Sequence, residues 1–189
     1  MFALVESGNI TQMPKGNKGI TLNNIQYPPT IYTLWSESER NAIGIYTVEI
    51  DNTNKKDEEW YTNTDITYAF SGGKVKGTYG TATAKAIADT GSGDNLVEGL
   101  KTIKKKSIDN QCAGLLAPSD WRVVKATETG GTMDSGWKTW RASVRTKCNS
   151  MQTQIDNASD VDALAALFTY TEQEDKSITR PLGEFPIKE

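Results

Sequence analysis

The sequence contains no histidine in its 189 residues. This absence removes the commonest general base, the serine–histidine and cysteine–histidine arrangements of hydrolases, and the usual zinc ligand. The only two cysteines, Cys112 and Cys148, cannot build a four-thiolate metal site and are too few for a disulfide-rich secreted scaffold. The sequence therefore predicts no metal site and no histidine-dependent catalysis.

The chain also lacks a strong charge of either sign and any long apolar run. Its formal net charge of -3 gives no basic footprint for nucleic acid. The apolar N-terminal residues meet Glu6 at once, with no basic stretch before them, so we expect no signal peptide. The longest later apolar run, residues 163–168, is far too short for a membrane span. Neither nucleic acid nor a membrane is expected as a partner.

Three segments resemble phosphate-binding, dinucleotide-binding or glycosidase motifs, but each lacks a residue or a spacing that its motif requires. Residues 72–74 (Gly-Gly-Lys) resemble the end of a phosphate-binding loop, but Val75 stands where Ser or Thr is needed. Residues 91–93 (Gly-Ser-Gly) lack the third glycine of a dinucleotide fingerprint. The adjacent acids at residues 57–59 would point to opposite sides of an extended segment, so we interpret them as a solvated loop. No catalytic residue and no cofactor are expected.

Residues 1–90 read as a β-rich head domain. A hairpin is predicted over residues 2–13 and a second, clearer one over residues 60–84, both joined by Gly-containing turns. Residues 36–39 (Ser-Glu-Ser-Glu) have the spacing of a capping box that opens one short helix. β-branched residues at 45–50 then predict a return to strand.

The character changes after the small, polar residues 91–93, which we interpret as a flexible linker. Residues 94–170 are predicted to form an antiparallel helical hairpin with a short third helix capped by Ser159. The first helix is expected to run from Asp94 until Pro118 stops it, followed by a loop over residues 120–131. Its expected apolar face comprises Leu96, Leu100, Ile103, Cys112 and Leu115. The expected face of the second helix comprises Trp137, Trp140, Val144, Cys148, Met151 and Ile155.

An extended tail, residues 171–189, completes the predicted α+β fold. Its apolar Leu182, Phe185 and Ile187 lie between or beside prolines in an otherwise polar segment, which predicts that they dock on something. Whether they dock on their own domain or on another chain stays open. Two helices with one buried stripe each are marginal alone, so packing against a partner or a second copy is also expected.

Two segments carry a resemblance to a known family. Residues 115–121 (Leu-Leu-Ala-Pro-Ser-Asp-Trp) and 140–145 (Trp-Arg-Ala-Ser-Val-Arg) resemble the tail assembly chaperone-like proteins of tailed bacteriophages. Their shared pattern is a helix ending in Leu-Leu, a Ser/Thr-Asp-Trp step, and a second helix with Tyr-Arg-x-x-x-Arg, where this chain has Trp140 in place of Tyr. The resemblance covers most of residues 96–157, and the N-terminal part only weakly.

The resemblance implies a non-enzymatic tail accessory protein without catalytic residues. Its partners would be tail-fibre or baseplate subunits, which it would bind as a chaperone-like cap or adaptor that remains in the virion tail after assembly in the host cytoplasm. The alternatives are a transient assembly chaperone absent from the particle and a host-surface polysaccharide-degrading enzyme. Candidate partner-binding residues are Trp121, Trp137, Trp140, Leu182, Phe185 and Ile187. Asp120 and Trp121 would serve the scaffold first, by capping the turn after the first helix and covering the hairpin end.

Overall fold

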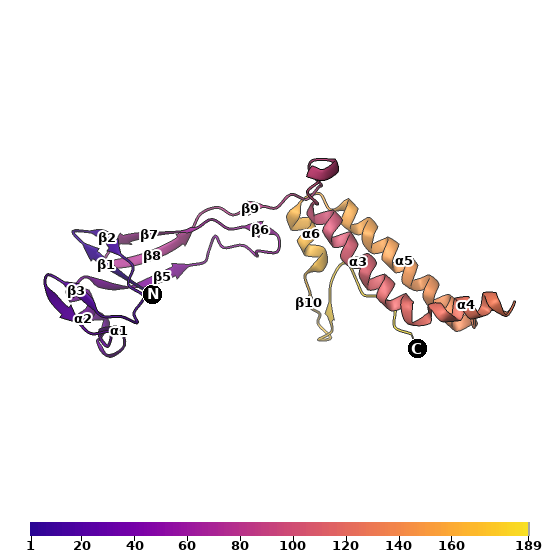
Figure 1. Cartoon of the computed structure of the whole chain (residues 1–189), viewed down its shortest axis with the longest axis horizontal. Coiled ribbons are helices and arrows are strands. Elements are labelled where there is room, and N and C mark those ends of the chain that lie inside the picture. Colours follow the sequence, from indigo (N-terminus) through magenta and orange to yellow (C-terminus); the bar gives the residue numbers. More distant parts are fainter. Residues whose placement is uncertain (189) are drawn as a thin grey trace. The chain divides into compact units, whose positions relative to one another are not determined.

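The computed structural model describes residues 1–188 and divides into two compact units (Figure 1). The first unit, residues 1–83, is rich in strands, and the second begins at Ala84 and is mainly helical. The predicted α+β fold class, with a β-rich N-terminal part followed by helices, is confirmed. The compact first unit ends earlier than the expected boundary at residue 90, so residues 84–90 belong to the second unit.

A five-stranded sheet forms the centre of the first unit. Its order is β2-β1-β5-β8-β7, and all neighbours are antiparallel except β5 and β8, which run parallel. The first predicted hairpin is β1 (Phe2–Glu6) and β2 (Asn9–Gln12), and the second is β7 (Ile66–Ser71) and β8 (Lys74–Tyr79). β5 (Ile45–Asp51) joins the two hairpins, so strands distant in sequence share one sheet.

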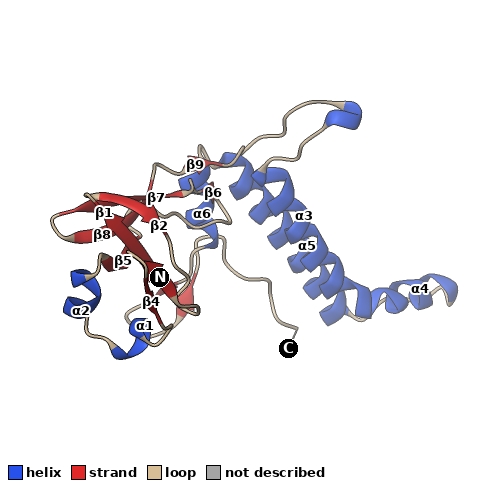
Figure 2. Cartoon of the chain, turned by 60° about the vertical axis from the view of Figure 1, so that its left-hand side comes forward, coloured by secondary structure: helices blue, strands red, loops and turns tan. Residues whose placement is uncertain are grey.

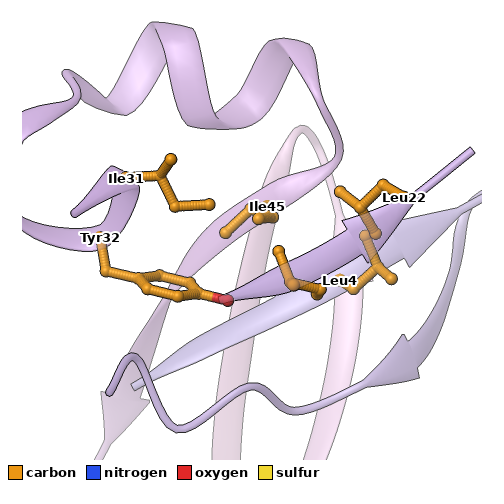
Figure 3. Close-up of a cluster of buried hydrophobic side chains, with 6 residues drawn as sticks. Leu4, Leu22, Ile31, Tyr32 and Ile45 are labelled. Carbon is orange, nitrogen blue, oxygen red and sulfur yellow. The ribbon is translucent and has the colours of Figure 1, made fainter. Parts of the chain in front are cut away.

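Both faces of this sheet carry a buried apolar cluster, because successive side chains of a strand point to opposite faces. Leu4 and Ile45 lie on the face that β3 (Ile20–Leu22) and α1 (Ile31–Leu34) cover, as Figure 3 shows. The cluster on the other face comprises Ala3, Val5, Val48 and Val75, with Ile10, Met13, Tyr46, Tyr68 and Phe70 packed against it.

Local signals place the connections of the first unit. Short β4 (Ile25–Tyr27) pairs with β3, and the predicted capping box opens α2 (Glu37–Ala42). There the backbone N–H of Ser36 donates to Oε2 of Glu39 at 2.8 Å, and the N–H of Glu39 donates to Ser36 Oγ at 3.3 Å. Gly44 then adopts φ +82° where a Cβ would lie 2.8 Å from the carbonyl oxygen of Val5, so only glycine fits.

The expected flexible linker is a closed turn. After β6 (Tyr61–Thr62) and β9 (Thr83–Ala84), Thr90 and Val97 exchange backbone hydrogen bonds of 2.9 and 2.8 Å around the 3-10 turn η1 (Gly93–Asn95). The N–H of Gly99 also donates to Asp89 Oδ1 at 2.7 Å. Small residues here serve a tight turn with positive φ at Gly91 and Gly93, so the prediction of a free linker was wrong.

The second unit is built on an antiparallel pair, α3 (Leu100–Leu116) and α5 (Ser135–Asn157), which lie side by side in Figure 2. At one end Lys105 Nζ lies 2.8 Å from Asp156 Oδ1, and at the other Arg141 donates to the carbonyl oxygen of Leu116. The buried core comprises Leu100, Ile108, Cys112, Val144, Cys148, Met151, Ile155, Ala158, Val161, Leu164 and Leu182. The predicted stripe of the second helix is therefore confirmed from Val144 to Ile155.

The stripe predicted for the first helix was only partly right. The helix begins at Leu100 and not at Asp94, so Leu96 lies before it and is half exposed. Ile103 is 47% exposed, because it lies on the opposite side of Leu100 from the buried Ile108. Leu115, at the end of the helix, is also partly exposed.

The segment expected to be a loop over residues 120–131 is largely helical. Pro118 does end α3, but it lies in the first turn of the 3-10 helix η2 (Ala117–Ser119), which leads directly into α4 (Asp120–Glu128). Proline is tolerated in a first turn because the N–H that it lacks has no helical partner there. A proline that stops one helix can therefore also begin the next.

A third helix and the tail follow α5 in the sequence. The third helix, α6 (Val161–Phe168), is capped by Asp160, whose Oδ1 accepts the N–H of Ala163 at 2.8 Å, and not by Ser159 as predicted. The tail follows with a two-stranded hairpin of β10 (Thr171–Glu172) and β11 (Ile178–Thr179).

Candidate protein-binding surface

α4 is the least buried α-helix of the second unit. None of its nine residues is buried, and Trp121, Val123 and Val124 are 54%, 43% and 54% exposed. Figures 1 and 2 show it extending beyond the end of the paired α3 and α5. A short helix with so little burial gains little from packing, so what holds it in place matters for what it can do.

Arg141 of α5 fixes the turn between α3 and α4. Its side chain is buried and donates to the carbonyl oxygen of Leu116 at 2.7 Å, to Ser119 Oγ at 2.5 Å and to Asp120 Oδ1 at 2.6 Å. Ser119, fully buried, in turn donates its hydroxyl to the carbonyl oxygen of Leu116 at 2.8 Å. These charge-assisted bonds tie the start of α4 to α5.

The same contacts join the two segments that carry the family resemblance. Asp120 comes from residues 115–121 and Arg141 from residues 140–145, and their ion pair closes the end of the helical pair. The expected capping role of Asp120 is not seen: the structure gives α4 no side-chain cap, and Asp120 pairs with Arg141 instead. Trp121, which was expected to cover the hairpin end, lies on α4 and is half exposed.

Trp121, Arg122, Trp137 and Trp140 form what we call the Trp–Arg cluster. The guanidinium carbon of Arg122 lies 4.6 Å from the ring centroid of Trp121 and 4.4 Å from that of Trp137. Trp137 and Trp140 meet edge to face with centroids 5.6 Å apart. Cation–π and edge-to-face contacts hold these large side chains in place while leaving much of Trp121 accessible.

The C-terminal tail docks on its own unit. Leu182 is fully buried, its N–H donates to the carbonyl oxygen of Leu167 at 3.1 Å, and its carbonyl oxygen accepts from Lys147 Nζ at 2.9 Å. Trp140 Nε1 donates to the carbonyl oxygen of Pro186 at 2.9 Å. The alternative left open by the sequence is thereby resolved for Leu182, which is a core residue and has no surface to offer a partner.

The other tail candidates are placed differently. Phe185 is half-buried, and Ile187 is 87% exposed beside Lys188, whose Nζ lies 5.4 Å from the Trp137 ring centroid. The structure therefore brings Trp121, Trp137 and Trp140 together with the last described residues of the tail.

A groove runs between α4 and α5 on the side of α4 away from Trp121. We call it the α4–α5 groove; its volume is about 500 Å³. Its lining comprises Val123, Ala126, Thr127, Gly131, Thr132, Met133, Lys138, Arg141, Ala142 and Arg145. The lining is mainly apolar, and every charged residue in it is basic.

The reactive side chains that the sequence suggested are the two cysteines and the three adjacent acids. Burial and the neighbouring Cys112 thiol raise the pKa of Cys148 to about 12, which keeps it a protonated, unreactive thiol. Asp57, one of the three adjacent acids, is exposed, and its Oδ1 accepts the backbone N–H of Glu59 in a local turn. Within residues 1–188, no three His, Cys, Asp or Glu side chains gather in a way that could hold a metal ion.

Reasoning from the sequence missed Arg122, the exposed Val123 and Val124, and the basic Lys138. The prediction of a loop at residues 120–131 hid the first three, and Lys138 was missed because it is a polar residue outside the apolar stripe of the second helix. The signal was present: an acid in the first turn, a lysine in the last, and the Gly-Gly pair beyond it are typical helix boundaries.

No helix within residues 1–188 combines the length and the apolar character that crossing a bilayer requires. Comparisons of the chain with protein-family models, with curated proteins and with solved structures found no match.

Proposed function

We propose that this chain is a non-enzymatic accessory protein of a phage tail, which binds a tail-fibre or baseplate subunit through α4 and acts as a cap or adaptor that stays in the virion. The observation that carries the proposal is the exposed apolar surface of α4, held in place by the buried Arg141. Trp121 of this surface and the Asp120–Arg141 ion pair that holds α4 both come from the segments that resemble the tail assembly chaperone-like proteins.

The physical character of the surface supports a protein partner. Tryptophan and arginine are the residue types most often found at the energetic centre of protein interfaces, and here Trp121 and Arg122 stack on one another. Trp121 and Val124 lie three residues apart and so share one face of α4. Because Arg122 is also held by Trp137, part of the ordering cost of binding is met before a partner arrives.

Tail fibres offer a reason for such a partner. Their β-rich subunits expose unpaired strand edges while they fold, and a bound cap suppresses wrong association. The apolar residues of α4 would cover such a subunit, and the first unit, with its own two-faced core, would serve as a separate second attachment point.

The test is co-purification of the tagged full chain with each tail-fibre and baseplate subunit encoded beside its gene. Val124→Ser should reduce the recovered subunit several-fold. Val97→Ser is the matched control, because Val97 is 62% exposed in the same unit but lies outside the α4 surface. Equal recovery with both variants, or recovery of no tail subunit, would overturn the proposal.

Mass spectrometry of purified virions distinguishes a cap or adaptor that stays in the virion from a transient assembly chaperone. A constant ratio to the major tail subunits is expected for a resident cap or adaptor. Absence from virions with abundance in the infected lysate would make the chain a transient assembly chaperone. Recovery of only the chain itself would indicate self-association as the role of the surface.

A further inference from the structure

We propose that the α4–α5 groove receives an amphipathic helix of the partner whose apolar face is flanked by acidic residues. This inference rests on the proposed function and names the chemistry that the same partner would present to the side of α4 next to the Trp121–Val124 face.

The floor of the groove is apolar and incompletely covered. Ala126 and Met133 are half-buried, and Val123 is 43% exposed although it faces the groove. Ala142, on the α5 side, is exposed and small, so it leaves room for side chains of an incoming segment. Apolar area left open between two helices is the surface that a third helix buries when it packs there.

The rim of the groove carries positive charge with no acidic neighbour in the lining. Lys138 and Arg145 are exposed, and in the described part of the chain neither side chain makes an ion pair or hydrogen bond. Arg141 is different, because Asp120 already balances its charge. The two unpaired cations lie seven residues apart on α5, about two helical turns, and so stay on the same side of that helix. Acidic residues two turns apart on a partner helix would match them.

A helix fits this groove better than an extended strand does. Most of the lining comes from α4 and α5, whose backbone N–H and C=O groups are already paired, so an extended segment would meet non-helical backbone only at residues 131–133 and would bury most of its own polar groups unpaired. A helix satisfies its own backbone and presents only side chains. The nine residues of α4 span roughly 13 Å, so about three turns of a partner helix would cover the groove.

The test uses two synthetic peptides with the same leucine and alanine face, one flanked by glutamates and the other by lysines, each titrated against the full chain by fluorescence anisotropy. The glutamate peptide should bind and the lysine peptide should bind at least about tenfold more weakly. The double variant Lys138→Glu, Arg145→Glu should weaken binding of the glutamate peptide by at least about tenfold and improve binding of the lysine peptide.

The matched control is Lys15→Glu, Lys18→Glu, which makes the same change of net charge at two exposed lysines of the first unit and should leave both affinities unchanged. Circular dichroism of all variants verifies that the helices remain folded. Equal affinity for the two peptides, or insensitivity to the charge reversal at residues 138 and 145, would overturn the inference.

Failure of this inference and failure of the proposed function are distinguishable. If a tail subunit co-purifies and the charge reversal in the groove leaves its recovery unchanged, the function stands and the acidic helix is wrong. If the glutamate peptide binds as expected and no tail subunit co-purifies, the groove stands and the phage-tail assignment is wrong.

Discussion

The helical unit contains two regions that differ in how they use apolar side chains. In its body, α3, α5, α6 and the tail bury theirs: Val144, Ile155 and Leu182 have no exposed area. In α4, a few residues away in sequence, Val123 and Val124 stand 43% and 54% exposed. The same residue type thus contributes to folding in one region and is left available in the other.

This difference separates stability from binding. Burial of large apolar side chains is the main favourable term in folding, so the free energy of the unit is concentrated in its body. α4 adds little of that area and depends on the Arg141 contacts for its position. Changes in the body should therefore alter stability, and changes on α4 should alter binding. Four predictions test this division, from the largest expected effect to the smallest.

Ile155→Ala should lower the free energy of unfolding by about 3–4 kcal/mol, because it removes a fully buried side chain and leaves a cavity. Chemical denaturation followed by circular dichroism measures the change. Ile178→Ala is the control: Ile178 is 67% exposed in the tail hairpin, and the same substitution there should cost well under 1 kcal/mol. Similar losses for both would contradict the assignment of the core.

Arg141→Met should cost about 2–3 kcal/mol, because it keeps most of the side chain's bulk but leaves the buried Ser119 Oγ without its donor and removes one of the two donors to the Leu116 carbonyl oxygen. Lysine at this position should recover only part of the loss, since it lacks the planar fork that reaches three acceptors. Hydrogen exchange should become faster in residues 120–128 than elsewhere in the unit. Unchanged exchange there would mean that Arg141 does not hold α4.

The Cys148 thiol should make stability fall at high pH. Its pKa is raised from 9.0 to about 12 in the folded chain, so the unfolded chain loses this proton first. The contribution is fully present below pH 9 and is lost as the pH rises toward 12. Unfolding measured across this range should show a weaker pH dependence in Cys148→Ala, whereas Cys148→Ala with the wild-type slope would show that the thiol does not titrate as described.

The long helix α5 and several elements of the first unit could be predicted from the sequence, because the signals for them are local. The stripe from Val144 to Ile155 steps by three and four residues, and a helix that buries one face requires that spacing. The capping box at Ser36 and the two Gly-containing hairpins are similarly complete within a few residues.

What could not be predicted depends on contacts between distant residues. The parallel pairing of β5 with β8 is not encoded in either strand, and the buried Leu182 is bonded through its backbone to Lys147 and Leu167, which are distant in sequence. α4 was missed for a different reason: a proline occurs both after the end of a helix and in the first turn of the next one, and we interpreted Pro118 only as an end. Apart from Trp121, the exposed residues of α4 were missed together with it, and the resemblance alone pointed to Arg141 and Arg145.

The smallest expected change in stability is at Val124, and it gives the most direct comparison of α4 with the buried body of the unit. Val124→Ser should change the free energy of unfolding by less than about 0.5 kcal/mol, because valine and serine have similar helix propensities and Val124 is already half in water. Val144→Ser, the same change at a buried position of α5, should cost about 2 kcal/mol or more. Denaturation of the two variants side by side measures the contrast. If Val124→Ser is as costly as Val144→Ser, α4 is part of the core. If it leaves stability intact and still reduces the recovered subunit several-fold, the apolar face of α4 is kept for the partner, because folding gives no reason to retain it.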